Sequence, residues 1–161
     1  MVRLRPIRAD DVDRWLSFLH RLSTHSKYLR FHHIPREMRP DDAARFCNVD
    51  YKDACAVVAE LPPEKNREIV AIGRYYRQPD GESAEIALVV DDALHGKGLG
   101  TRIIEWLVDV ARRNGISRFE ADILPENEEM MKVLVDCGFQ ISSQLEDGVY
   151  RVSFPIESII D

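Results

Sequence analysis

Three glycines at alternate positions, Gly96, Gly98 and Gly100, stand at the start of a segment with helical periodicity. The first N–H groups of a helix have no partner inside the helix, and the helix dipole adds positive potential there. Because glycine has no Cβ atom, alternate glycines let an anion approach those N–H groups closely. The spacing therefore predicts a phosphate cradle, although a glycine-rich turn before an ordinary helix would show the same pattern.

A carboxylate lies on the predicted strand that leads to these glycines. Glu85 belongs to the apolar segment 84–90, and Asp91 and Asp92 separate that segment from the glycines. A carboxylate held near a bound substrate is suited to taking a proton as a general base. The simpler interpretation is a solvent-exposed charge at the start of a strand.

Two common phosphate-binding motifs do not fit these glycines. The G-x-G-x-x-G fingerprint needs its third glycine three residues after the second and follows the first strand of a doubly wound fold. Glu120, near where a ribose-binding acid would be sought, leaves a dinucleotide-dependent oxidoreductase as an alternative. A P-loop needs Ser or Thr after Gly-Lys, whereas Gly98 follows Lys97 here.

The elements that must position these groups begin with a strand and several helices. Residues 2–5 alternate apolar and basic, as in a strand with one buried face, and Pro6 places that strand at an edge or an end. Helical spacing follows from Val12 to Leu22, with Asp10 and Asp11 as candidate caps. Two further helices are expected, over about 24–31 after a Ser23 or Thr24 cap, and from Asp41 to about Phe46.

Three strands are expected next, over 54–61, 68–76 and 84–90. The links between them are too short for a helical crossover, so the three strands form an antiparallel meander. Gly73 within the second strand marks a bulge or a close backbone approach.

The second half of the sequence predicts one parallel pair of strands. A helix from Gly100 to about 114 and an alternating strand over 117–123 complete a strand-helix-strand unit. Asn127 is placed to cap another helix that ends at Gly138, and a hairpin follows over 139–154. The sequence thus predicts one α+β domain over 1–161, with a mixed, mostly antiparallel sheet, one central parallel pair that can splay into a cleft, and helices on both faces.

Composition narrows the choice of partners. The chain of 161 residues is 45% hydrophobic with a formal net charge of −6, which is unlike a nucleic-acid-binding protein. The apolar runs are too short to cross a membrane, and the first residues have no signal-peptide core, so a cytoplasmic location is expected. The thiols of Cys47, Cys55 and Cys137 are expected to be reduced, and no metal is expected, since the adjacent His32 and His33 lack ligand spacing.

Several motifs together resemble the GNAT superfamily of acyl-CoA-dependent N-acyltransferases. The segment 95–100 is similar to the family's Gln/Arg-x-x-Gly-x-Gly/Ala loop, with His95 as a departure at its first position. Asn127, with Gly138 and Phe139 eleven residues later, is similar to the last helix of the family and the strand after it. Within the family, segments 22–31 and 84–90 resemble the acetyltransferase domain of Pat-type bacterial protein lysine acetyltransferases, in which larger domains accompany it.

The resemblance implies transfer of an acetyl group from acetyl-CoA to a primary amine, with Glu85 as the general base. It implies that the coenzyme A pyrophosphate binds the loop, and that the pantetheine arm and thioester lie along the strand and reach Asn127. The residues expected to bind the cofactor are Leu88, Val89, Val90, His95, Gly96, Lys97, Gly98, Leu99, Gly100, Thr101 and Asn127.

The family's usual general acid is missing. Many members have a tyrosine seven residues after the asparagine, where this chain has Leu134. Tyr75, Tyr76 or Tyr150 remain as substitutes, or the thiolate leaves unaided. The missing tyrosine also leaves a non-catalytic acyl-CoA sensor open as an alternative.

The acceptor side is less defined by the sequence. Tyr28 and Arg30 are candidates for shaping an acceptor pocket, and Tyr28 with Phe31 has the spacing of a packing pair. A protein lysine and a small amine both remain open as acceptors, and the chain is expected to be a monomer or a homodimer.

Overall fold

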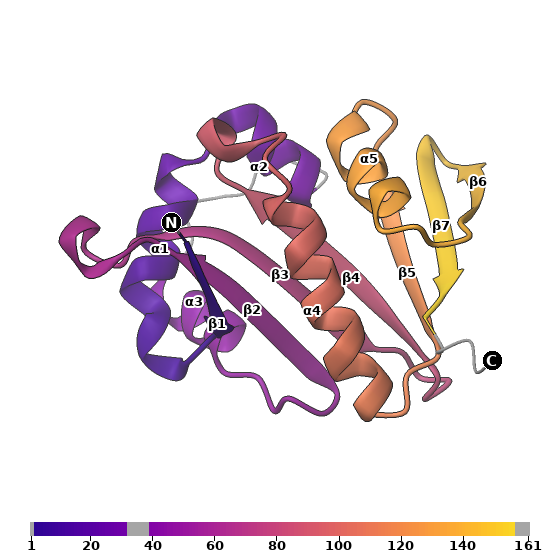
Figure 1. Cartoon of the computed structure of the whole chain (residues 1–161), viewed down its shortest axis with the longest axis horizontal. Helices are drawn as coiled ribbons and strands as arrows, with labels where there is room; N and C mark the ends of the chain where they lie inside the picture. The colour runs from indigo at the N-terminus through magenta and orange to yellow at the C-terminus, as the bar shows by residue number, and fades with distance from the viewer. Residues whose placement is uncertain (1, 32–38, 157–161) are drawn as a thin grey trace.

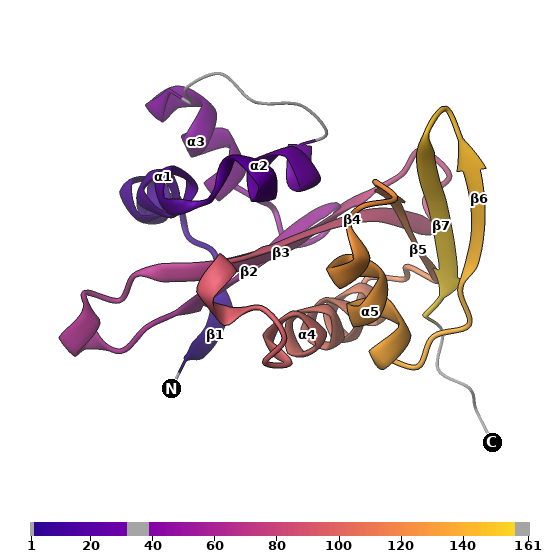
Figure 2. The same ribbon diagram turned by 90° about the horizontal axis from the view of Figure 1, so that it is seen from above.

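The computed structural model describes residues 2–31 and 39–156, which form a mixed sheet with helices on both faces (Figures 1 and 2). Among these residues the sheet has seven strands in the order β1-β2-β3-β4-β5-β7-β6, and only β4 and β5 run parallel. The strands are β1 (Arg3–Pro6), β2 (Ala54–Glu60), β3 (Ile69–Arg77), β4 (Ser83–Val90), β5 (Arg118–Ile123), β6 (Ser142–Glu146) and β7 (Val149–Pro155).

The helices divide between the two faces of the sheet, as Figure 2 shows. One face carries α1 (Val12–Arg21), α2 (Thr24–Phe31) and α3 (Pro40–Cys47), and the other carries α4 (Leu99–Arg113) and α5 (Glu128–Asp136). Short 3-10 turns are η1 (Ala9–Asp11), η2 (Pro63–Lys65) and η3 (Asp92–Leu94). The expected α+β class, with a mostly antiparallel sheet and a central parallel pair, is confirmed.

Each face of the sheet covers its own apolar cluster. Apolar side chains of α4, including Ile103 and Leu107, pack on the face that carries α4 and α5. Trp15 and Phe18 of α1 pack on the opposite face. At Gly73 of β3 an added Cβ would lie 2.3 Å from Ile103 Cγ2, so this glycine permits the close approach of β3 and α4. The pairing of β3 with β4 continues through Gly73 without a bulge.

The parallel pair is short, and this opens the sheet. β4 and β5 pair only at Ser83, Ala84 and Glu85, and Glu85 lies opposite Glu120. Beyond that point β4 continues to pair with β3 as far as Val90, while β5 continues with β7. The predicted splay of the two central strands is therefore confirmed.

Two local predictions differ from the structure. Asp11 stands at the N-cap position of α1 but makes no side-chain cap bond. Its carboxylate instead accepts hydrogen bonds from Arg5 at 2.7 and 2.8 Å and from the backbone N–H of Arg8, because the buried guanidinium is the stronger partner.

The first strand of the final hairpin also starts later than predicted, at Ser142 rather than at 139. The chain turns at Gly138 with φ of +82°, and Phe139 stacks on Phe154 at 4.7 Å instead of pairing in the sheet. The predicted hairpin turn itself is present, with positive φ at Asp147 and Gly148. His32 and His33 lie outside the described residues.

Candidate functional site

A cavity opens between the splayed strands on the side of α4 and α5. Its empty space, including space open to solvent, is about 780 Å³. We call it the loop pocket. Its walls include ten of the eleven predicted cofactor-binding residues, namely Leu88, Val89, Val90, His95, Gly96, Gly98, Leu99, Gly100, Thr101 and Asn127. Lys97 does not line it.

The three glycines of the loop have two different roles. Gly96 and Gly98 have φ of +75° and +79°, a conformation that side chains disfavour, and the space where a Cβ would lie is open. Gly100 instead allows close packing, since an added Cβ would lie 3.0 Å from both Leu88 and Val133. Helix α4 begins at Leu99, so the N–H groups of its first turn have no partner within the helix. A pyrophosphate therefore fits the loop, with backbone donors and open space before it.

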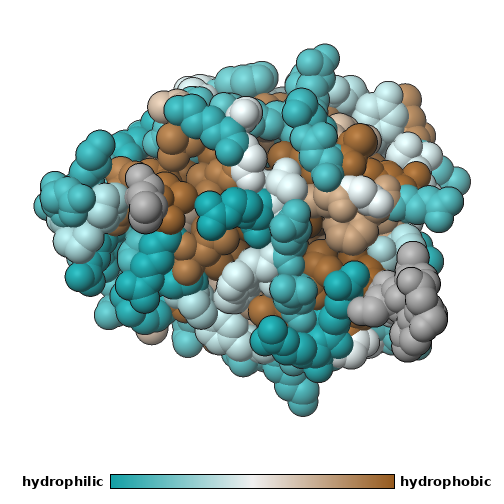
Figure 3. Space-filling model, in the orientation of Figure 1, coloured by the Kyte–Doolittle hydropathy of each residue, from teal (hydrophilic) through white to brown (hydrophobic). Residues whose placement is uncertain are grey.

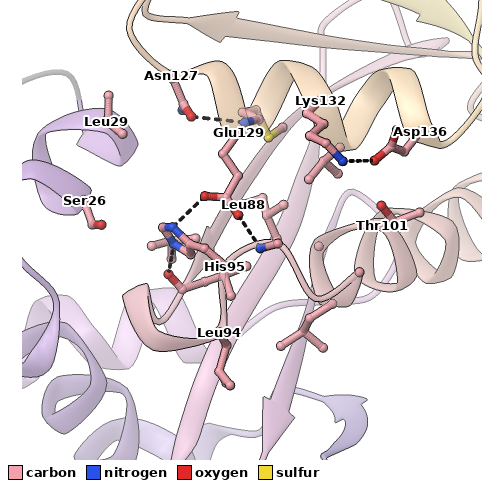
Figure 4. Close-up of a pocket in the computed structure, with 18 of the residues that line it drawn as sticks. Ser26, Leu29, Leu88, Leu94, His95, Thr101, Asn127, Glu129, Lys132 and Asp136 are labelled. Carbon is pink, nitrogen blue, oxygen red and sulfur yellow. Dashed lines mark hydrogen bonds and ion pairs between the residues drawn. The ribbon is translucent and has the colours of Figure 1, made fainter.

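A carboxylate of α5 reaches into this cradle (Figure 4). Glu129 accepts a hydrogen bond from the Gly96 N–H at 3.2 Å and lies 2.5 Å from His95 Nδ1. The other ring nitrogen of His95, Nε2, lies 2.8 Å from the Val90 carbonyl oxygen. The predicted anion site thus holds an anionic side chain of the chain itself, which the sequence pattern did not reveal.

Asn127 has the predicted capping geometry. Its Oδ1 accepts from the Met130 N–H at 3.1 Å and starts α5 beside the loop pocket.

A second carboxylate, that of Asp92, connects the loop with the start of α2 on the opposite face of the sheet. Asp92 of η3 accepts from the backbone N–H of Ser23 at 3.2 Å and from the hydroxyl of Ser26. Burial raises the pKa of Asp92, but these hydrogen bonds and nearby His95 lower it below its usual range. The contact fixes the first turn of α2 beside the cradle, so that Leu29 and Arg30 of α2 line the loop pocket.

A second cavity, which we call the acceptor pocket, adjoins the loop pocket and shares part of its lining. It encloses about 700 Å³, including open solvent, and is lined by Glu85 to Leu88 of β4, Ala121 to Ile123 of β5, Leu29 to Phe31 of α2, and Asn127 and Met130. Glu85 is exposed to solvent in this pocket and pairs across the sheet with Tyr76 of β3. Arg30 lines both pockets, whereas Tyr28 lines neither.

The residues considered as general acids differ in position. Leu134 is fully buried in the core. Tyr75 is also fully buried, and its hydroxyl accepts from Asn114 at 2.9 Å on the α4 side of the sheet. Tyr76 is 38% exposed, and its hydroxyl accepts from Arg74 at 3.0 Å. Tyr150 is half-buried opposite Ile123. None of the three tyrosines lines either pocket.

The cysteines are unsuited to nucleophilic chemistry. Burial raises the pKa of Cys47 and of Cys137 to about 11 and that of Cys55 to about 12, so these thiols stay protonated at neutral pH.

Within residues 2–31 and 39–156, no group of three or more His, Cys, Asp or Glu side chains is arranged to hold a metal ion. No helix in the same part of the chain has the length and apolarity needed to cross a membrane. Polar residues cover much of the face in Figure 3, with apolar residues reaching the surface between them.

A domain family and two curated proteins are similar in sequence to this chain. The sequence profile of an acetyltransferase (GNAT) domain matches residues 2–140. Acetyltransferase PA5475 of Pseudomonas aeruginosa is 30% identical over 138 residues, which cover 86% of this chain and 74% of that protein. Acetyltransferase Pat of Mycolicibacterium smegmatis is 30% identical over 81% of this chain, which spans 39% of that longer protein.

Solved structures show the same architecture. The GNAT domain of S. lividans PAT is 36% identical, with a TM-score of 0.86 over 96% of this chain and 90% of that chain. The fold of yncA from Salmonella typhimurium, a putative acetyltransferase solved with its cofactor acetyl-CoA, matches with a TM-score of 0.75 at 17% identity, covering 100% of this chain and 97% of that one.

Proposed function

Since the chain belongs to the GNAT acetyltransferase family and is thus an acetyl-CoA-dependent N-acyltransferase, we propose that its acceptor is the side-chain amine of a protein lysine. The observation that carries the proposal is the position of Glu85. This carboxylate lies in the acceptor pocket, which no residue of the glycine loop lines, at the last residue where β4 and β5 pair. The resemblance to Pat-type protein acetyltransferases supports lysine as the acceptor.

The loop pocket is the proposed cofactor site. We assign the pyrophosphate of acetyl-CoA to the backbone N–H groups between His95 and Thr101, because helix starts and positive-φ glycines present several donors to one anion. Lys97, which does not line the pocket, contributes through its backbone and its charge. Glu129 must leave the Gly96 N–H when the pyrophosphate binds.

The edge of β4 is the proposed guide for the pantetheine arm. From Ile86 to Val90 this strand pairs with β3 on one side, and on the other side no described strand pairs with it. The backbone groups on that open side need partners, and an extended chain with amide groups supplies them. Leu88, Val89 and Val90 therefore lead the thioester from the loop toward Glu85.

Glu85 is the proposed general base. A lysine ammonium has a pKa of about 10.4, so removing its proton at pH 7 requires roughly 4.6 kcal/mol. The exposed carboxylate of Glu85 takes that proton directly or through a water molecule, and the neutral amine then attacks the thioester carbonyl. Asp122 also lines the acceptor pocket but lies 3.4 Å from Arg151, so Glu85 is the carboxylate left to favour a cationic acceptor.

An acceptor panel tests the proposal. The purified chain is incubated with acetyl-CoA and with lysine peptides whose N-termini are blocked, with polyamines, or with amino sugars, and coenzyme A release and acceptor mass are followed. We expect acetyl groups on the lysine side chains of the peptides. Turnover restricted to small amines would contradict the lysine assignment, and tight acetyl-CoA binding without turnover on any amine would indicate a sensor.

A further inference from the structure

The two pockets meet at a short junction. The residues that line both of them are Leu29, Arg30, Leu88, Asn127 and Met130. An acyl-CoA whose pyrophosphate occupies the glycine loop lies in the loop pocket, while Glu85 lies in the acceptor pocket. The scissile C–S bond must therefore reach this junction. Arg30 is the one charged residue of the described chain that lines both pockets.

Arg30 has no carboxylate within ion-pair distance among the described residues, although Glu85 lies close enough to interact with its charge. Arg30 lies half-buried at the end of α2 with its guanidinium 4.9 Å from the centre of the Phe31 ring. No carboxylate among residues 2–31 and 39–156 forms an ion pair with it. Burial, followed by the nearby charge of Arg74, lowers the pKa of Arg30 to about 10, although Tyr76 and Glu85 act in the opposite direction, so the group still carries its charge at neutral pH.

Arg74 adds a second positive charge near Arg30, although it lines neither pocket. It is 2% exposed, and its Nη1 donates to the Phe46 carbonyl and to the Tyr76 hydroxyl. Its buried Nη2 has no hydrogen-bond partner among the described residues. Two guanidinium groups without an ion-pair partner in a largely apolar setting are costly, and an anion formed nearby would offset that cost.

The other charged groups in the pocket walls are mostly paired. In the loop pocket Lys132 binds Asp136 at 3.0 Å, and His95 binds Glu129 (Figure 4).

In the acceptor pocket Asp122 lies 3.4 Å from Arg151. Glu85 is the remaining charge, and it is the proposed base on the acceptor side. The charges that act on the junction without an ion-pair partner are therefore Arg30 and Arg74 on one side and Glu85 on the other.

We infer that the Arg30 guanidinium stabilises the coenzyme A thiolate as it leaves, which is the task of the tyrosine that Leu134 replaces. This inference rests on the proposed function. The amine nitrogen forms the new C–N bond, the C–S bond breaks, and its electron pair stays on sulfur. Glu85 receives the amine proton and passes it to water. Arg30 keeps its protons and donates a hydrogen bond to the sulfur, which later takes a proton from solvent.

A titration of bound coenzyme A tests the inference without any acceptor. The ultraviolet absorbance of the thiolate is followed against pH for free coenzyme A and for its complexes with wild type, Arg30→Met and Arg30→Lys. Burial raises the pKa values of Cys47, Cys55 and Cys137, so the protein thiols contribute little near neutral pH, and the same titration without coenzyme A supplies the baseline. Arg113→Met is the matched control, since Arg113 is exposed at the far end of α4, about 20 Å from the loop.

We expect wild type to lower the pKa of the bound thiol by about 1 to 3 units, as a cation at short range does. Arg30→Met abolishes the shift, Arg30→Lys retains part of it, and Arg113→Met leaves it unchanged. An equal thiol pKa in wild type and Arg30→Met would overturn the inference. Because no amine takes part, this result is independent of whether lysine is the acceptor.

Steady-state kinetics give a second readout. Arg30→Met should lower kcat by about 100-fold, the usual loss for one transition-state donor, and added guanidinium should restore part of it. A raised acceptor KM with unchanged kcat would show that Arg30 binds the acceptor and would overturn the inference. Arg30→Gln provides a second neutral variant if the methionine variant does not fold.

Discussion

Glu129 occupies the glycine loop that we propose as the cofactor site, so its removal should tighten the binding of acetyl-CoA. Its carboxylate accepts from the Gly96 N–H at 3.2 Å, the donor that we assign to the pyrophosphate. Glu129→Gln keeps the shape and one acceptor oxygen but removes the negative charge. We therefore predict a lower Kd for acetyl-CoA in this variant.

The magnitude follows from Coulomb's law. Two unit charges about 5 Å apart repel by about 3 kcal/mol at an effective dielectric constant of 20 and by about 0.8 kcal/mol in water. The Glu129 side chain is 38% exposed, so the lower value applies. About 1 kcal/mol corresponds to a Kd roughly five-fold lower, and the difference should shrink as salt is added.

Isothermal titration of acetyl-CoA measures this effect. Glu128→Gln is the matched control, because Glu128 is also in the first turn of α5 but is exposed and lines neither pocket. Both variants lose a similar favourable interaction with the helix dipole, so the comparison isolates the contacts that Glu129 makes with Gly96 and His95 of the loop. Unchanged or weaker binding by Glu129→Gln, relative to Glu128→Gln, would refute the competition.

Three further predictions concern the fold and the thiols. Gly73→Ala places a Cβ 2.3 Å from Ile103 Cγ2, so it should lower the unfolding free energy by about 2 kcal/mol and the Tm by about 5 °C, as calorimetry can check. Asp11→Asn should lower the unfolding free energy at pH 7 by about 3 kcal/mol in urea titrations, because it breaks a buried pair with Arg5. Burial raises the pKa of Asp11, but hydrogen bonds from Arg5 and Arg8 lower it below its usual range, so the difference between the two proteins should persist above about pH 4 and disappear as the pH falls further. Iodoacetamide should label the native protein far more slowly than the unfolded protein at pH 8, since burial raises the pKa of all three thiols; equal rates would contradict this.

The sequence predicts the strands and helices well where local signals agree. The meander, the helix after the glycines and the hairpin turn at Asp147 and Gly148 each have a periodic or turn signal, and the structure contains them. The start of β6 is wrong in the prediction, because Phe139 alternates like a strand residue but is drawn into an aromatic stack with Phe154.

The contacts across the cleft are harder to predict, because they join residues far apart in the chain. Glu129 meets the loop from a separate helix, 33 positions after Gly96. Asp92 reaches Ser26 over 66 positions, and the sequence shows only a short acidic loop. Arg30 is visible as a candidate for the acceptor side, but its place at the junction of both pockets depends on how α2 crosses the splayed strands.

The most direct test of the account compares Glu85→Gln with wild type in two measurements, kcat for acetyl transfer to a lysine peptide and Kd for acetyl-CoA. Glu82→Gln, three residues earlier and exposed outside both pockets, is the control. A general base predicts a kcat at least about 100-fold lower with Kd nearly unchanged. A kcat for Glu85→Gln equal to that of Glu82→Gln, or a parallel loss of turnover and cofactor affinity, would contradict the assignment of Glu85 as the base.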